Sequence, residues 1–410
     1  MESTCPSGIW TIGKVRRGYA LKMKILICTF TFPPNKDGVS EAASSMAKAF
    51  LAQGWHVDIA TQPANPTREK LIWNGAFIHQ FDISGGTYWR YPLQGQIAEY
   101  QSFLLEGDWD IVVFHSYSSE LYAALPCLHS ISGRKILVSH GYGAMIWVPV
   151  EKFPYGLVSY VSAVLKSLAV PFWLRRFDRV IFLSARPDLR AFYDLLLAKL
   201  SFHPGIRVVP NGVDPESRGG APGAFRQSHG IGEQESLFLC VANYSLRKDQ
   251  GFACRAYRKA AMPDSVLVFI GSEFNEFSDK WKQEDTIYAH PPGRVIWIEG
   301  LDREATLNAL AECDIFILSA NHEAQPIVLL EAMREAKPWI ARDAGCIRRM
   351  TGGVCVEREE EMASAMKMWV EQPELGRKQG RQGREAVKAD YTIDQYRERY
   401  CKVVQELADL

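Results

Sequence analysis

Short apolar runs rich in β-branched residues recur along the chain, and amphipathic stretches separate them. Runs of this kind are typical of buried strands in parallel sheets, and the stretches between them are typical of covering helices. The runs of the first half are residues 24–28, 56–61, 111–115, 135–139 and 179–183. The runs of the second half are residues 237–241, 266–270, 295–299, 315–318 and 338–341. This pattern predicts an α/β fold with two Rossmann-like, doubly wound domains in tandem.

The domain boundaries follow from where the pattern stops. A chain of 410 residues is too long for one ordinary core, and two domains with an interdomain cleft are expected. The polar, Gly- and Pro-rich stretch 215–234 has no periodicity and predicts a linker. We divide the chain as follows: an N-terminal extension 1–22 expected to be disordered, a first domain 23–206, a second domain 207–390, and a final amphipathic segment 391–410 expected to cross back to the first domain.

The N-terminus and the longest apolar stretch each have a membrane-related alternative. The basic stretch before the apolar residues 25–32 resembles a signal peptide, but the run is short, ends at Pro33 and lacks a small-residue cleavage site. We therefore interpret it as a first strand, with a translation start at Met23 as an alternative. Residues 156–174 contain Lys166 and Pro171 and fall short of the roughly 18–20 apolar residues of a transmembrane helix. No transmembrane helix is predicted.

Charge and cysteine content narrow the class of protein. The 47 basic and 47 acidic side chains balance, so no long-range field attracts nucleic acid, and a nucleic-acid partner is not expected. The nine cysteines are scattered without a Cys-x-x-Cys spacing near histidines, and Cys28, Cys240 and Cys313 lie in apolar stretches. This usage is typical of reduced, buried thiols in a cytoplasmic protein.

The segment 321–333 carries the most specific chemistry. It follows an expected strand, and Pro326 suits the start of a helix, so we expect the helix to begin near Gln325, with Glu323 in the loop and Glu331 inside the helix. At about 1.5 Å per helical residue, the two carboxylates lie on the order of 10 Å apart, with the free amides of the first turn between them. A nucleotide sugar fits this arrangement because amides bind its diphosphate and carboxylates bind the hydroxyls at either end. The alternative is that Glu331 belongs to a solvated helix face with Arg334 and Glu335.

In its context, "DIFILSANHEAQPIVLLEAMREAKPWIARDAG", this segment resembles the glutamate motif of the GT-B glycosyltransferases, in particular the retaining family 4. The resemblance extends from about Met23 to the C-terminus and is strongest after Val208. It implies that Glu331 holds the ribose hydroxyls and that Glu323 contacts the donor sugar. It also implies that the amides around Gln325, Ile327 and Val328 contact the phosphates. Gln325 and Pro326 replace the more usual small and aromatic residues, which leaves the donor preference open.

The loop 241–249, after the first strand of the second domain, is the second candidate for donor binding. Arg247 and Lys248 could neutralise a diphosphate in binding and as charge builds on the leaving group. In the family this loop supplies an arginine and, five residues later, a lysine. Lys248 matches the lysine, whereas Asn243 stands at the arginine position. Arg247 could compensate from another backbone position, and an ordinary basic surface turn is the alternative for both residues.

The first domain contributes weaker signals at the ends of its strands. Gly38, in the turn after residues 24–28, would let the backbone approach a phosphate, with Val39 or Ser40 opening the next helix. His140 follows residues 135–139 and would face the cleft, where it could bond a donor-sugar hydroxyl or orient the acceptor. A satisfied turn histidine is the alternative, and His115 is a weaker candidate. The segment 208–214, with a strong Asn-Gly turn, is assigned a structural role.

The resemblance implies a retaining, metal-independent hexosyltransferase of polysaccharide biosynthesis. The expected catalytic residues are His140, Lys248 and Glu323. The substrates are a nucleotide-sugar donor and a saccharide or lipid-linked acceptor, and no metal or other cofactor is expected. No convincing carboxylate nucleophile stands out, which favours a front-face route. Two alternatives remain open: an epimerase or hydrolase on the same fold, and a non-catalytic sugar-binding module.

The segment 142–177 combines aromatic and basic residues. Such a stretch could rest on a membrane surface or receive a lipid-linked acceptor, while helix packing on the first domain is the alternative. We therefore expect a cytoplasmic protein with possible peripheral contact at the inner face of the membrane.

Overall fold

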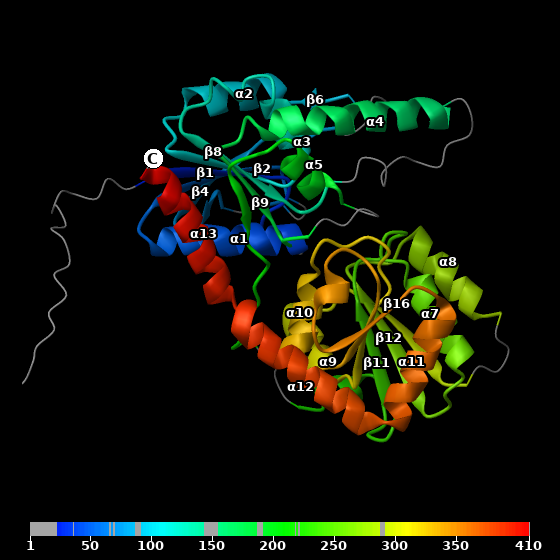
Figure 1. The fold of residues 1–410 in the computed structure, drawn as a ribbon. Coiled ribbons are helices and arrows are strands. Elements are labelled where there is room, and N and C mark those ends of the chain that lie inside the picture. Colours follow the sequence, from blue (N-terminus) through cyan, green and yellow to red (C-terminus); the bar gives the residue numbers. More distant parts are fainter. Residues whose placement is uncertain are drawn as a thin grey trace, which may run out of the picture.

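The computed structural model describes residues 23–35, 37–64, 67–68, 70–86, 92–142, 155–186, 192–217, 219, 222–287 and 292–409. Figure 1 shows two α/β domains, one above the other, joined along one side by the C-terminal helices. The described residues thus confirm the expected α/β fold with two Rossmann-like domains. The expected N-terminal extension, 1–22, lies outside the described residues.

The first domain is built on an eight-stranded sheet of order β10-β9-β8-β7-β1-β2-β4-β3. Its strands are β1 Lys24–Thr29, β2 His56–Thr61, β3 Ile72–Trp73, β4 Ala76–Gln80, β7 Ile111–His115, β8 Arg134–Ser139, β9 Arg179–Phe182 and β10 Ile206–Val208. All pairs are parallel except β3 with β4, and the strand order reverses between β1 and β7. A separate hairpin joins β5 Ile83–Ser84 to β6 Gln94–Gly95.

Two helical layers cover this sheet. One face packs on α1 Gly38–Ala52 and on the last helix, α13 Ile393–Ala408. The other face packs on the helices α2 Ile97–Glu106, α3 Ser119–Ala124, α4 Tyr155–Leu174 and α5 Asp194–Leu200. Burial on both faces explains why the central strands read as continuous apolar runs.

The second domain has a six-stranded parallel sheet of order β13-β12-β11-β14-β15-β16. Its strands are β11 Ser236–Val241, β12 Ser265–Gly271, β13 Arg294–Glu299, β14 Ile315–Leu318, β15 Trp339–Arg342 and β16 Gly353–Val356. Its helical elements are α6 Ala224–Ser228, α7 Gln250–Ala260, α8 Glu276–Asp285, α9 Arg303–Glu312, α10 Ile327–Arg334, η1 Ile347–Arg349, α11 Glu359–Glu371 and α12 Pro373–Asp390. The order reverses between β11 and β14, so the loops after these two strands flank the expected ligand crevice.

The expected linker 215–234 instead packs on the second domain. Phe225 and Ile231 are part of its core, and Arg226 pairs with Asp314 at 2.8 Å. The chain passes between the domains just before this segment, at Val213, which donates from its amide to the Tyr391 carbonyl at 2.9 Å. The segment lacks periodicity because its described residues contain a single short helix, α6.

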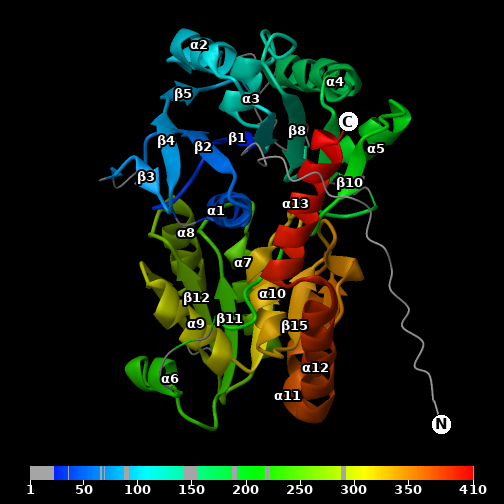
Figure 2. The same ribbon diagram turned by 90° about the vertical axis from the view of Figure 1, so that its left-hand side faces the viewer.

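The C-terminal helices return the chain to the first domain (Figure 2). Ile393 donates from its amide to the Val213 carbonyl at 2.8 Å, so the two crossings run side by side. Beyond them, the Tyr396 hydroxyl donates to the Ala42 carbonyl at 2.9 Å, and Arg207 pairs with Glu406 at 3.0 Å. The last helix is therefore part of the first domain's core although its sequence follows the second domain.

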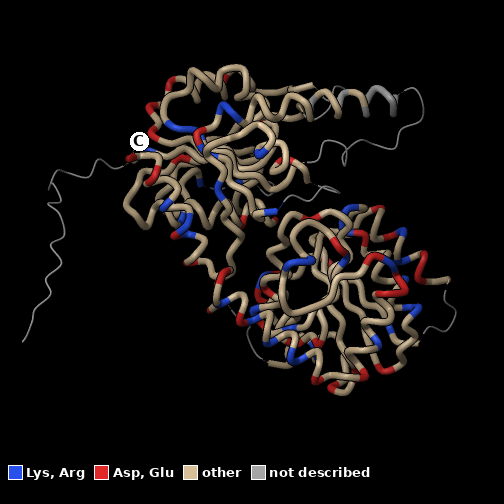
Figure 3. The backbone as a smooth tube through the Cα atoms, in the orientation of Figure 1, with Lys and Arg blue, Asp and Glu red and all other residues tan. Residues whose placement is uncertain are grey.

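The charges, the hydropathy and the cysteines of the described part add three observations. Basic and acidic residues are interspersed along the backbone of both domains (Figure 3). None of the helices in the described ranges is long and apolar enough to cross a membrane. The eight cysteines in these ranges are free thiols. Cys28 in β1, Cys240 in β11 and Cys313 at the end of α9 are buried, as expected.

Candidate functional site

The loops after β11 and β14 lie together at the carboxyl edge of the second sheet. The Ser319 hydroxyl donates to the Lys248 carbonyl at 2.8 Å, and the Asn321 amide donates to the Arg247 carbonyl at 3.0 Å. These bonds bring the Lys248 ammonium into an ion pair with the Glu323 carboxylate. Two residues that the sequence places 75 positions apart therefore form one unit at the strand-order reversal.

The backbone around Glu323 is held by close packing. Gly345, after β15, adopts a left-handed φ of +57°, and a Cβ there would lie 1.7 Å from the Glu323 carbonyl oxygen. Next to it, the Cys346 amide donates to the Ala324 carbonyl at 3.2 Å. Only glycine permits this approach, so the loop presents a buried Glu323 from a fixed backbone.

The helix α10 begins at Ile327, two residues later than expected, with Pro326 in an extended conformation as its N-cap. Proline has no N–H group, and the amides of Ile327 and Val328 have no helical carbonyl four residues before them. The N-terminus of α10 thus directs two backbone donors and the positive end of its dipole at the cleft.

Glu331 is buried within α10, at 5% exposure, and accepts a hydrogen bond from the Arg303 guanidinium. Burial contradicts the alternative in which Glu331 belongs to a solvated face. Arg334 is also buried and binds the Glu335 carboxylate at 2.9 Å. The sequence analysis did not identify Arg303. It follows β13 closely, and ligands in such sheets bind just beyond the ends of strands, so its position in the sequence could have indicated it.

The other residues expected to bind the sugar donor are Gln325, Asn243 and Arg247, and they differ in burial. Gln325 is buried, and its side-chain oxygen accepts from the Asn211 amide at 2.6 Å, which ties the donor loop to the segment that joins the domains. Asn243 and Arg247 are exposed on the loop after β11. Gln250 steadies this loop by donating to the Asn243 carbonyl at 3.2 Å. A direct contact of these residues with a donor stays a prediction.

Gly38 lies where the two domains approach. It is the first residue of α1, one position ahead of the expected helix start, and the Asp37 carboxylate caps this helix by accepting from the Val39 amide at 2.9 Å. A Cβ on Gly38 would lie 4.0 Å from the Ile327 side chain. The N-termini of α1 and α10 therefore face each other across the cleft.

His140 and His115 form a pair at the ends of β8 and β7. Their Nε2 atoms lie 3.4 Å apart and their ring centroids 4.5 Å apart. His115 is fully buried, whereas His140 is partly exposed. Burial lowers the pKa of His140 to about 4, although the nearby Asp37 carboxylate acts in the opposite direction. Burial, and then the neighbouring His140, lower the pKa of His115 well below its ordinary value. Both imidazoles are neutral at pH 7.

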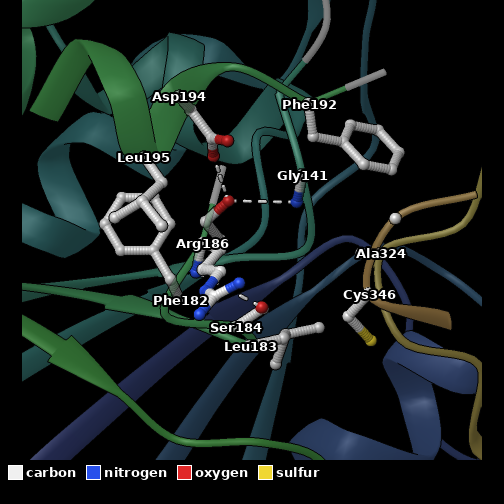
Figure 4. Close-up of a pocket in the computed structure, with 12 residues that line it drawn as sticks. Gly141, Phe182, Leu183, Ser184, Arg186, Phe192, Asp194, Leu195, Ala324 and Cys346 are labelled. Carbon is white, nitrogen blue, oxygen red and sulfur yellow. Dashed lines mark hydrogen bonds between the residues drawn. The ribbon is translucent and has the colours of Figure 1, made fainter. Parts of the chain in front are cut away.

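A pocket between the domains adjoins His140 and the Glu323 loop (Figure 4). The first domain lines it with Ser139, Gly141, Phe182, Leu183, Ser184, Arg186, Phe192, Asp194 and Leu195, and the second with Ala324, Gly345 and Cys346. This pocket confirms the expected interdomain cleft.

Asp194 is the buried acid of this pocket. It accepts a hydrogen bond from the Ser139 hydroxyl, whose oxygen accepts in turn from the Gly141 amide at 3.0 Å. Burial raises the pKa of Asp194 to about 6. The network holds the turn that carries His140. Sequence analysis missed Asp194 because a single acid at a helix start carries no motif.

Within the described ranges, no group of three histidine, cysteine or acidic side chains is arranged to hold a metal ion. At this edge of the sheet, Lys248 is a cation paired with Glu323, and the free amides at the start of α10 are neutral hydrogen-bond donors.

Comparison with known proteins links this geometry to a family. Residues 36–217 match the family described as Glycosyltransferase Family 4, and residues 223–386 match Glycosyl transferases group 1. The chain is 25% identical over 205 residues to the trehalose synthase of Rubrobacter xylanophilus, and this match covers 46% of the chain and 49% of that protein. The match thus spans about half the length of this curated relative.

Two solved structures share the fold over nearly the whole chain. Sucrose-phosphate synthase from Thermosynechococcus elongatus superposes with a TM-score of 0.76 at 16% identity, covering 94% of this chain and 99% of that one. The Anabaena protein HepE, in complex with UDP-glucose, superposes with a TM-score of 0.71 at 15% identity, covering 94% and 100%. The two family matches together cover most of both domains, and the chain belongs to the GT-B glycosyltransferases, with a first domain of the family 4 type and a second domain of the group 1 type.

Proposed function

We propose that this protein transfers a sugar from a nucleoside-diphosphate donor to a hydroxyl of a saccharide or lipid-linked acceptor, with retention at the anomeric carbon. The observation that carries the proposal is the convergence of Lys248, Glu323, Glu331 and the N-terminus of α10 on one edge of the second sheet, opposite Gly38. The two carboxylates suit the hydroxyls of a sugar and of a ribose, and the lysine and the backbone amides between them suit a diphosphate.

In this proposal the donor lies along α10. The ribose hydroxyls bind the Glu331 carboxylate, the diphosphate binds the amides of Ile327 and Val328 together with Lys248, and the sugar hydroxyls bind Glu323. Lys248 and Glu323 neutralise each other in the structure, so a diphosphate can take over the ammonium while the sugar hydroxyls take over the carboxylate. UDP-glucose is the first donor to test, because HepE binds it.

We propose a front-face reaction without a metal ion or other cofactor. The bond from the anomeric carbon to the diphosphate oxygen breaks, and the acceptor oxygen forms its bond on the same face. The acceptor proton passes to the departing diphosphate. Lys248 and the α10 amides stabilise the charge that grows on the leaving oxygen. The pocket beside His140 is the proposed acceptor position, since it opens between the first domain and the Glu323 loop.

The test is a nucleotide-release assay with a panel of nucleotide sugars, run with and without candidate acceptors. Acceptor-dependent release of nucleoside diphosphate, with a glycosylated product of retained configuration, is the expected result. Release without any acceptor would indicate a hydrolase, and a rearranged sugar would indicate an epimerase. Donor binding without turnover across the panel would favour a sugar-binding module.

We further propose that α4 docks on an anionic membrane surface from the cytoplasmic side. Figure 1 shows α4 extending beyond the sheet of the first domain. Four apolar side chains, spaced as on one helix face, are exposed along it: Val161 at 47%, Leu165 at 61%, Leu168 at 64% and Phe172 at 75%. The helix contains no acidic residue, and two arginines follow its end, so its charge complements anionic lipid. Residues 143–154 of the expected membrane segment lie outside the described ranges.

Co-sedimentation with vesicles tests this contact. We expect binding to vesicles that contain phosphatidylglycerol, little binding to phosphatidylcholine alone, and weakening by salt. Leu168→Glu should reduce binding, whereas the matched control Ile72→Glu, which changes an exposed apolar residue on the edge strand β3, should not. No binding by the unmodified protein, or equal loss in both variants, would refute the assignment to α4.

A further inference from the structure

The contact between His115 and His140, at the ends of β7 and β8, limits which ring nitrogen of each histidine can be protonated. Each ring turns its Nε2 toward the other, at 3.4 Å. Two neutral imidazoles can share only one proton in such a contact, so one Nε2 donates and the other accepts. The direction of this hydrogen bond decides which nitrogen of His140 carries its own proton.

The surroundings of His115 select the direction. Its Nδ1 is buried and has no hydrogen-bond partner among the described residues. If His140 donated, the His115 proton would sit on Nδ1 as a buried N–H group without an acceptor, which is a rare and costly arrangement. If His115 donates from Nε2, its buried Nδ1 is a bare nitrogen with no proton to satisfy. The second arrangement is the more stable one.

We propose that His115 is a positioning residue that holds His140 in the Nδ1–H tautomer, so that His140 offers a ligand in the cleft a hydrogen-bond donor and not a base. Nε2 of His140 is occupied by His115, which leaves Nδ1 as the ring nitrogen for the ligand. An N–H group at this position can donate a hydrogen bond to a sugar hydroxyl oxygen or to a phosphate oxygen. The charged group that faces His140 from α1 is Asp37, which is engaged in capping that helix.

The role of this proton in turnover rests on the proposed function, but the tautomer itself does not. Long-range proton–nitrogen NMR of the full chain with ¹⁵N-labelled histidine, at pH 7 and without substrates, reports which ring nitrogen is protonated. His140→Gln assigns the His140 signals by their loss. We expect a protonated Nδ1 and a bare Nε2 for His140, with the opposite assignment for His115. A protonated Nε2 on His140, or a doubly protonated ring, would overturn the proposal even if glycosyl transfer were demonstrated.

Two substitutions of His115 separate positioning from packing. Glutamine places an amide N–H near the Nε2 position, whereas leucine keeps similar bulk without a donor. We expect His115→Gln to retain the His140 tautomer and most of kcat. His115→Leu should lose the single tautomer and lower kcat about five- to tenfold, with donor KM little changed, as expected for one neutral hydrogen bond. Equal behaviour of the two variants, with both folded by thermal denaturation, would show that His115 only fills space.

Discussion

Replacing Glu331 by alanine removes the carboxylate to which we assign the donor ribose. Glu331 is 5% exposed and is bound by the Arg303 guanidinium. The side chain of Arg303 is 55% exposed, so it can turn into water once its partner is gone. The folded protein should therefore tolerate the substitution, because no buried cation is left without a partner.

The expected loss of donor binding follows from the hydrogen bonds removed. A hydrogen bond to a charged group contributes about 1.5–3 kcal/mol, and each 1.4 kcal/mol changes a dissociation constant about tenfold. Glu331→Ala should then weaken donor binding by about tenfold to 100-fold. Glu331→Gln, which keeps one acceptor oxygen in the same place, should show a smaller loss.

Arg303→Ala is the matched control, because it removes the same ion pair and leaves the carboxylate in place. Isothermal titration calorimetry with nucleoside diphosphates and their sugars measures donor affinity for each variant. Donor affinity should fall in Glu331→Ala and stay near the unmodified value, or rise, in Arg303→Ala. Equal losses in the two variants would refute the assignment of the ribose to Glu331, since the ion pair and not the carboxylate would then matter.

Three further outcomes are expected. Lys248→Ala should lower kcat by on the order of 100-fold in steady-state assays, because the lysine charge stabilises the leaving oxygen in the transition state. Arg247→Ala should lower kcat less. A larger loss in Arg247→Ala than in Lys248→Ala would assign the phosphate contact to the arginine. Activity should survive an excess of chelator, and loss that Mg²⁺ or Mn²⁺ restores would contradict the leaving-group chemistry. Burial raises the pKa of the Asp194 carboxyl from 3.8 to about 6, so the folded state binds the carboxyl proton more tightly than the unfolded state. The stability that this proton adds to the folded protein is present at low pH and is lost as the pH rises from about 4 to about 6. Asp194→Asn should therefore raise Tm, relative to the unmodified protein, more at pH 7 than at pH 5, and a pH-independent difference would exclude this titration.

Much of the fold could be predicted from the sequence because its strands are buried on both faces. Such strands appear as continuous apolar runs, and all ten expected runs are strands whose ends differ by no more than two residues. The strands that escaped prediction include β4, with its alternating pattern, and the four-residue β16 near the sheet edge. Partial exposure and short length weaken the local signal at these positions.

Glu323, Glu331 and Lys248 could also be identified as candidate site residues from the sequence, because a loop, a helix start and a strand end each have a local sequence pattern. That their side chains meet was decided by the order of strands. β11 pairs with β14, whose sequence follows two intervening strands, and only this pairing brings Lys248 to Glu323. Strand order depends on long-range packing, which no window of sequence contains.

The sequence by itself therefore determined the element types, the two-domain α/β class and the residue kinds suited to a nucleotide sugar. Tertiary structure alone decided the partners: Arg303 for Glu331, Asn211 for Gln325, and His115 for His140. The physical reason is that helices and strands form from hydrogen bonds and apolar spacing close in sequence, whereas these contacts depend on how separate elements pack into sheets and layers.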